Sequence, residues 1–170
     1  MLAALGCRFV IVGHSERRHG MGEDDNAVAL KLRAAQRDQL TPIVCVGETL
    51  IEREAGKTAE VLVRQVQAAY EGLGEQAALD TVIAYEPVWA IGTGKVASLE
   101  QAREAHQIVR ATLDRVAARG TGARMAILYG GSVNATNAPA LFADEELDGA
   151  LVGGASLEAA SFWRIAAAAS

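Results

Sequence analysis

The chain is organised around residues 81–95, which read Thr81-Val82-Ile83-Ala84-Tyr85-Glu86-Pro87-Val88-Trp89-Ala90-Ile91-Gly92-Thr93-Gly94-Lys95. The apolar run at the start of this segment predicts a buried strand that delivers Glu86 at its end. Pro87 ends the strand, because it has no N–H to donate and its φ is fixed. The stiff residues that follow, mixed with Gly92 and Gly94, are typical of a loop that moves as a stiff flap. Glu86 is then either a base that needs water excluded or an incidental glutamate in a surface turn.

Composition and charge exclude several classes of protein. The chain has 170 residues, 51% of them hydrophobic, which is enough to build a sizeable core. The net charge of −5 argues against a nucleic-acid partner. No apolar run approaches the roughly 20 residues that span a bilayer, so we expect no membrane partner. Cys7 and Cys45 lie in apolar runs without CxxC spacing, which favours reduced thiols in a cytoplasmic protein over a disulfide or a metal site.

Apolar runs of strand length alternate with longer helical patterns, and this alternation predicts βαβ units around a parallel sheet. The predicted strands span residues 7–12, 42–46, 81–84, 124–129 and 149–152. Helices are predicted at about residues 24–39, 49–72 with a break near Gly56, from Ser98 to Gly120 or Gly122, 136–142, and finally up to the C-terminus. Ser98 and Gln101 have the spacing of a capping box. No linker interrupts the pattern, so the chain is one domain or part of one.

Every predicted strand ends in residues that could take part in chemistry: His14, Glu48, Glu86, Gly130-Gly131-Ser132 and Gly153-Gly154. In a parallel α/β protein the carboxyl ends of the strands meet on one face, where ligands bind. The two glycine pairs come just before helices, where successive N–H groups attract an anion, and the Ser132 hydroxyl adds a further donor. We therefore predict a phosphate site. The alternative is two tight turns that need positive φ.

His14 and Glu86 are the candidate acid–base pair. A glutamate can remove a carbon-bound proton, and a histidine within hydrogen-bonding distance can polarise the neighbouring oxygens. A lone histidine after a strand is more often structural, but this one lies on the predicted phosphate face. Ser15 could cap a helical turn whose N–H groups keep His14 neutral. We expect Arg17 to pair with a carboxylate such as Glu48, and Lys95 to lie at the solvent edge of the loop.

Four segments together resemble the triosephosphate isomerase family: residues 12–18, 84–95, 129–133 and 151–157. The resemblance covers the whole chain and implies an α/β fold, the parallel (β/α)8 barrel. A complete barrel has eight units in about 250 residues, whereas five units are predicted here. Residues 1–170 are therefore expected to form one partial barrel domain, from strand 4 to helix 8 of the family pattern, without the first third.

The resemblance also implies roles for particular residues. Glu86 would move a proton between adjacent carbons of dihydroxyacetone phosphate and glyceraldehyde 3-phosphate through an enediolate, a reaction of glycolysis and gluconeogenesis. His14 would be the neutral electrophile, with Glu16 supporting the site from behind. The phosphate would be held by Gly92, Ser132, Gly153 and Gly154. The closing lid would comprise Pro87, Val88, Trp89, Ala90, Ile91, Gly92, Thr93, Gly94, Lys95, Val96 and Ala97. No metal or cofactor is implied, and the family forms homodimers.

The same resemblance implies an asparagine and an essential lysine in a loop that these residues do not match. Lys31, Lys57 and Lys95 fall in predicted helices or in the lid. For the chain alone we expect two open apolar edges, self-association, and weak or absent isomerase activity. The alternatives are a non-catalytic partial barrel that binds phosphate or assembles with itself, and another phosphate-binding barrel enzyme.

Overall fold

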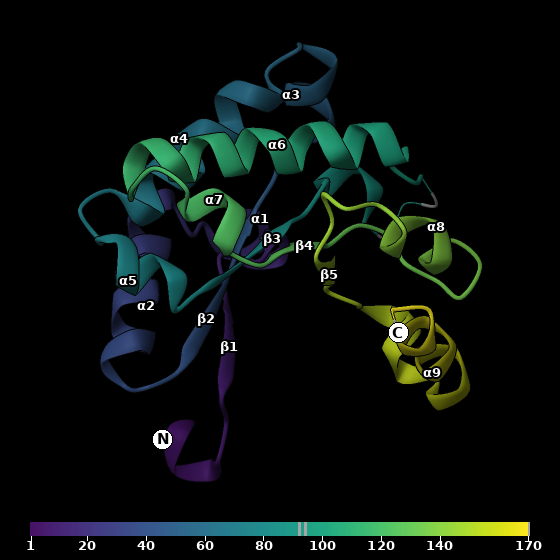
Figure 1. Ribbon diagram of the computed structural model, residues 1–170, viewed down its shortest axis with the longest axis horizontal. Helices are drawn as coiled ribbons and strands as arrows, with labels where there is room; N and C mark the ends of the chain where they lie inside the picture. Colours follow the sequence, from purple (N-terminus) through teal and green to yellow (C-terminus); the bar gives the residue numbers. More distant parts are fainter. Residues whose placement is uncertain (92, 94, 170) are drawn as a thin grey trace.

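The computed structural model describes residues 1–91, 93 and 95–169, which build a curved parallel sheet with helices along its outer face (Figure 1). Strand order follows the chain, β1-β2-β3-β4-β5, and each neighbouring pair is parallel. The strands are β1 Phe9–Val12, β2 Thr41–Val46, β3 Val82–Tyr85, β4 Ile127–Tyr129 and β5 Gly149–Ala150. The predicted five-unit α/β architecture is confirmed. The fourth strand begins later than predicted, because residues 121–124 form a helical turn, and the fifth ends earlier, at Ala150.

The helices are α1 Ser15–Met21, α2 Asp25–Arg37, α3 Leu50–Glu54, α4 Thr58–Tyr70, α5 Glu75–Leu79, α6 Leu99–Val116, α7 Thr121–Arg124, α8 Ala138–Phe142 and α9 Ala159–Ala167, with 3-10 turns η1 Ala3–Leu5, η2 Val88–Ala90 and η3 Gly154–Leu157. The predicted break near Gly56 separates α3 from α4. The predicted capping box of Ser98 and Gln101 starts α6. Neither α5 nor α7 was expected, because four or five residues are too short to carry a helical period.

The hydrophobic core lies between the outer face of the sheet and the helices. Alternate strand residues, including Val44, Ile83 and Ile127, belong to it together with helix residues such as Leu62 and Val109. Because side chains alternate across a strand, the residues between them face the other way, into the hollow of the curve. One face of this sheet is therefore fully covered.

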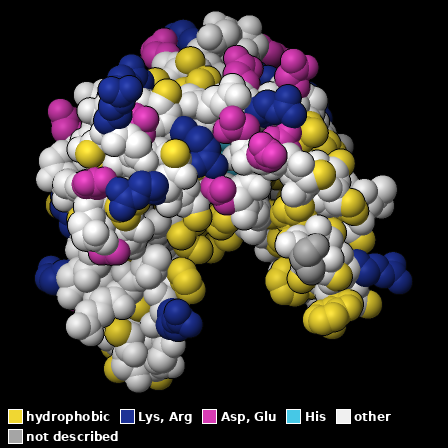
Figure 2. All heavy atoms as spheres, in the orientation of Figure 1, with side chains coloured by type: hydrophobic (Ala, Val, Ile, Leu, Met, Phe, Trp, Pro, Cys, Tyr) yellow, Lys and Arg dark blue, Asp and Glu magenta, His cyan; other side chains and the backbone are white. Residues whose placement is uncertain are grey.

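The inner face and the two outer strands are much more open. β1 and β5 each pair with a single neighbour. Phe9 is 53% exposed and Ile11 is 44% exposed. The molecule has the outline of an arch, and hydrophobic side chains line the hollow beneath it (Figure 2). The prediction of exposed apolar edges is thus confirmed.

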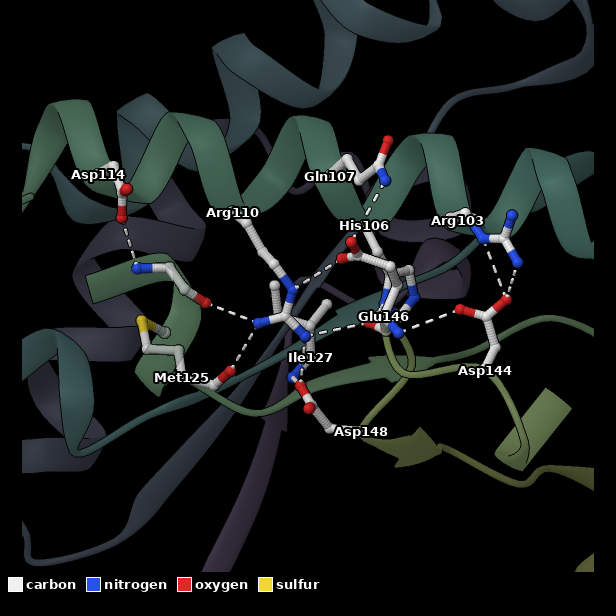
Figure 3. A network of polar contacts seen from close by, with 11 residues as sticks. Arg103, His106, Gln107, Arg110, Asp114, Met125, Ile127, Asp144, Glu146 and Asp148 are labelled. Carbon is white, nitrogen blue, oxygen red and sulfur yellow. Dashed lines mark hydrogen bonds and ion pairs between the residues drawn. The ribbon is translucent and has the colours of Figure 1, made fainter. Parts of the chain in front are cut away.

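A polar network ties α6 to the loop between α8 and β5 (Figure 3). We call it the α6 seam: Arg103, His106 and Arg110 on the helix, with Asp144, Glu146 and Asp148 on the loop. Arg110 donates to the carbonyl oxygens of Gly122 and Glu146 and to Asp148 Oδ2, at 2.6, 3.0 and 2.8 Å. The seam fixes the path of the chain into β5, and the glycine pair at 153–154 follows that strand.

Candidate active site

A cavity of about 470 Å³ opens at the carboxyl ends of the strands, on the inner side of the arch. It is lined by residues from β1, from the loops after β1, β3, β4 and β5, and from the lid segment: Ile11, His14, Glu86, Ile91, Gly130, Gly131, Ser132, Val133, Asn134, Leu151, Val152, Gly153, Gly154 and Ala155. The topology therefore brings together the predicted residues His14, Glu86, Ser132, Gly153 and Gly154.

Glu86 is held from two sides by the turn that follows β1. His14 Nε2 lies 2.9 Å from Glu86 Oε1. The backbone N–H of Ser15 donates to Glu86 Oε2 at 3.0 Å. His14 itself caps α1, since its Nδ1 accepts from the N–H of Glu16 at 3.4 Å. The expectation that Ser15 caps this turn is wrong, because its side chain does not serve as the cap and its N–H is used to orient Glu86.

Burial sets the electrostatics of the carboxylate. Glu86 is only 3% exposed, and this burial raises its pKa, while His14 and the Ser15 N–H act in the opposite direction. The Cys45 thiol also contacts Glu86 from β2, and burial raises the pKa of that thiol above its ordinary value. A desolvated carboxylate with a raised pKa is a better proton acceptor than one in water.

Three glycines let the backbone approach closely around Glu86. A Cβ on Gly47 would lie 1.7 Å from the carbonyl oxygen of Glu86. One on Gly130 would lie 2.9 Å from Glu86 Cγ, and one on Gly131 would lie 2.2 Å from the hydroxyl oxygen of Tyr129. Only glycine fits at these three positions, because a Cβ would clash with the neighbouring atoms. Positive φ is not the reason, since neither Gly130 nor Gly131 is left-handed.

The second glycine pair faces open space. A Cβ on Gly153 or Gly154 would meet nothing within 4 Å, and neither residue has positive φ. The alternative of two tight turns that need positive φ therefore fails for both pairs. Gly154 begins η3, so its backbone N–H belongs to a helical start. Among the described lining residues none is a lysine or an arginine, so an anion there would be held by backbone and hydroxyl donors.

Residues 87–97, the predicted lid, contain η2 near their start, and Trp89 binds this segment to the rest of the protein. The indole Nε1–H donates to Glu48 Oε1 at 2.9 Å, and Arg53 stacks over the same ring at 4.9 Å. Glu48 is fully buried and also pairs with Arg53 at 3.0 Å. The expected Arg17–Glu48 pair is therefore wrong, because Arg17 pairs with Glu23 instead. Lys95 is exposed, as predicted.

Some predicted site residues are not brought into the cavity. The side chain of Glu16 is exposed and does not line it, so its supporting role stays a prediction. Gly92 and Gly94 lie outside the described residues. Sequence analysis missed Asn134 and Cys45. Asn134 follows Ser132 by two residues, so its place beside the predicted phosphate loop was a signal, whereas nothing local pointed to Cys45.

The described part of the chain lacks two features, a metal-binding cluster and a membrane-spanning helix. It contains no cluster of three or more histidine, cysteine, aspartate or glutamate side chains arranged to hold a metal ion. Over the same residues, no helix is long and apolar enough to cross a membrane.

Comparison with known proteins agrees with the geometry. The family model described as triosephosphate isomerase matches residues 1–169. The chain belongs to the triosephosphate isomerase family. Its parallel five-stranded sheet is accordingly an incomplete barrel of that family, whose members are isomerases.

Several curated relatives named triosephosphate isomerase are similar over nearly the whole chain. The one from Delftia acidovorans is 56% identical over 169 residues, which are 99% of this chain and 67% of the relative. That from Moorella thermoacetica is 56% identical over 162 residues, covering 95% of this chain and 65% of the relative. A third, from Bordetella pertussis, is 55% identical over 168 residues, with coverage of 99% and 66%. The chain thus spans about two thirds of the length of these relatives.

Proposed function

We propose that this protein acts in the interconversion of dihydroxyacetone phosphate and glyceraldehyde 3-phosphate, with Glu86 as the base. The observation that carries the proposal is the meeting of Glu86 and His14 at 2.9 Å in the cavity that also exposes Gly153 and Gly154. These groups come from three different strand ends. An isolated structural ion pair would not need a cavity bordered by a glycine pair at the start of a helical turn.

In the proposed reaction Glu86 removes a proton from the carbon next to the carbonyl, which leaves an enediolate. It then returns a proton to the neighbouring carbon, so no atom is gained or lost overall. His14 also moves the oxygen-bound proton: its Nε2–H is given to the former carbonyl oxygen, and the ring regains a proton from the neighbouring hydroxyl. Because Nδ1 already accepts from Glu16, a neutral ring carries its proton on Nε2 and offers a donor to the substrate.

The other end of the substrate is a phosphate. We assign it to the N–H groups around Ser132, Gly153 and Gly154, with Gly92 as the lid's contribution. Successive amides at helical starts are a natural anion site. Residues 87–97 would close over the substrate and exclude water, which strengthens every interaction inside the site. Glu16 would support His14 through the first turn of α1.

A second candidate function follows from the lining of the cavity. None of its described lining residues is a cation, and developing negative charge on an enediolate needs a nearby positive group. The chain without further residues would then bind phosphate and catalyse weakly or not at all. We further propose a cytoplasmic location, which the free thiols Cys7 and Cys45 support, and homodimers as the functional assembly.

The test is deuterium exchange from D2O into dihydroxyacetone phosphate, combined with the isomerisation assay. The chain is measured alone and with the third of the Delftia acidovorans relative that it does not match. We expect exchange and isomerisation to rise strongly with that third present, and Glu86→Gln to lower both by about 1,000-fold. Glu75→Gln, which removes an exposed carboxylate paired with Arg124, is the matched control. Full activity in Glu86→Gln would refute the proposal.

A further inference from the structure

Arg18, on α1, joins the ends of β1 and β2 and is not among the described residues that line the cavity. The ladder between these strands ends at the pair of Val12 and Val44. In the same register the next pair would be Gly13 and Cys45. Arg18 takes the place of this pair, because its Nε donates to the carbonyl oxygen of Gly13 at 2.8 Å and its Nη2 to that of Cys45 at 3.2 Å. One guanidinium thus continues the link between the two strands beyond their last ladder pair.

The guanidinium is enclosed and held on its third side as well. Only 9% of the Arg18 side chain is exposed, and its Nη1 donates to Asp25 Oδ1 at 2.7 Å. The other carboxylate oxygen of Asp25 accepts from Arg64 on α4 at 3.0 Å, so Asp25 is itself fixed. A Cβ on Gly13 would lie 3.2 Å from Arg18 Nη2, which leaves little room between the guanidinium and the strand end. A planar fork can make these three bonds from one position, whereas a lysine ammonium is a point charge on a flexible stem.

The two carbonyl groups that the guanidinium binds belong to the segments that touch Glu86. Gly13 directly precedes His14 and Ser15. The ring of His14 contacts one carboxylate oxygen of Glu86, and the N–H of Ser15 donates to the other. From the second segment, the Cys45 thiol contacts the same carboxylate. The spacing of the two segments therefore decides whether all three contacts can be made together, and the guanidinium sets that spacing.

Arg18 also acts on Glu86 through its charge. Burial raises the pKa of Glu86, and four groups act against this shift: His14, the Ser15 N–H, the Cys45 thiol and Arg18. The titratable or charged groups among them come from the turn after β1, from β2 and from α1. A lysine at position 18 would keep a positive charge there but would lose the fork. Charge and position can therefore be separated by experiment.

We propose that Arg18 is a positioning residue for Glu86. Its guanidinium fixes the turn after β1 to β2, so that His14 and the Ser15 N–H meet the carboxylate that the β2 thiol also contacts. The inference rests on the proposed function, in which Glu86 is the base, although the geometry itself does not depend on the reaction. A purely structural role, in which Arg18 only attaches α1 to Asp25 at the start of α2, predicts no effect on the contacts of Glu86.

The test compares Arg18→Lys and Arg18→Gln with the unchanged full chain, in the absence of substrate. The titration of the Glu86 carboxyl is followed by carbon NMR, with Glu86→Gln to assign its signal, and hydrogen exchange of the Ser15 amide is measured in the same samples. We expect both Arg18 variants to raise the pKa of Glu86 by about half a pH unit or more, because donors to the carboxylate are lost. Exchange of the Ser15 amide should accelerate about tenfold or more, while that of Val109 on α6 stays unchanged.

Arg64→Gln is the matched control, because it withdraws a cation from the same Asp25 carboxylate without breaking the two bonds to the carbonyl oxygens. It should change neither readout. Where the two readouts differ, exchange of the Ser15 amide decides. The proposal is overturned if this amide exchanges in Arg18→Lys as in the unchanged chain, since a charge at position 18 would then be sufficient. It is also overturned if Arg18→Lys fails to fold while Arg64→Gln folds, since Arg18 would then serve the fold alone. Neither readout requires catalysis, so failure of the proposed isomerase reaction would be seen separately.

Discussion

Two regions of the molecule bury charged side chains and treat them in opposite ways. In the α6 seam opposite charges meet, and Asp148 Oδ2 accepts from both Arg110 and the N–H of Ile127, at 2.8 and 2.7 Å. In the active site, Glu86 is held by His14, the Ser15 N–H and the Cys45 thiol, with an open cavity beside it. A network of paired charges holds segments together, whereas a buried carboxylate beside a cavity keeps capacity for a substrate. The difference predicts opposite effects of mutation on stability.

The largest effect is expected from Arg110→Ala. It would leave three backbone carbonyls, those of Gly122, Met125 and Glu146, and the partly exposed Asp148 carboxylate without their donor. We expect the free energy of unfolding to fall by about 3 kcal/mol, mainly because the backbone carbonyls lose their donor, measured by urea denaturation. Arg124→Ala, which breaks an exposed pair with Glu75, is the control and should cost less than about 1 kcal/mol. Equal losses in the two variants would contradict the account of the seam.

The seam should also make the protein acid-sensitive through His106. Burial lowers the pKa of His106 to about 4 from an ordinary value of 6.5. In the unfolded chain His106 is protonated at a higher pH than in the folded one. The contribution of the buried neutral ring to the free energy of unfolding is therefore complete above pH 6.5, decreases as the pH falls, and is lost below about pH 4. The loss is about 3 kcal/mol. His106→Gln should flatten this part of the pH profile of unfolding, and His19→Gln, on the exposed α1 surface, should not.

The predicted lid lies between the two extremes, since Glu48 holds it through a charge-assisted hydrogen bond from Trp89 and a backbone bond from the Val88 N–H. Trp89→Phe removes the donor to Glu48 but leaves Arg53 paired with that carboxylate. We expect a loss of about 1.5 kcal/mol in the local opening free energy. Amide hydrogen exchange at Ala90 and Ile91 should then accelerate about tenfold, with the α6 amides unchanged. Unaltered exchange at both positions would mean that Glu48 does not hold the lid.

The smallest expected effect has the reverse sign. Glu86→Gln replaces a carboxylate whose pKa is raised by burial with a neutral group of the same shape. At pH 7 the buried charge costs stability, so the variant should be more stable to urea by about 1 kcal/mol. The paired change in the seam, Asp148→Asn, should destabilise. If both variants were less stable to urea, the proposed difference between the seam and the active site would be wrong.

Sequence reasoning recovered features that depend on neighbours along the chain. The Ser98–Gln101 capping box, the break at Gly56 and the five strand ends are all local patterns. It failed where the partner is distant or ambiguous. From the sequence alone Arg17 could pair with several carboxylates. The fold places it beside Glu23, and Glu48 pairs with Arg53. The seam was not predicted at all, because Arg110 and Asp148 are 38 residues apart and each alone resembles a surface charge.

Strand order along the sheet follows strand order along the chain, and this has a consequence for how the protein folds. Each β/α unit meets its neighbour as soon as that neighbour has been synthesised, so loop-closure entropy is small at every step. The bond from the Ser15 N–H to Glu86 bridges 71 residues, and the contact of His14 with the same carboxylate reaches equally far along the chain. The sheet can therefore grow from the ribosome one unit at a time, and the contacts that hold Glu86 can form once β3 is in place, before β4 and β5 are added.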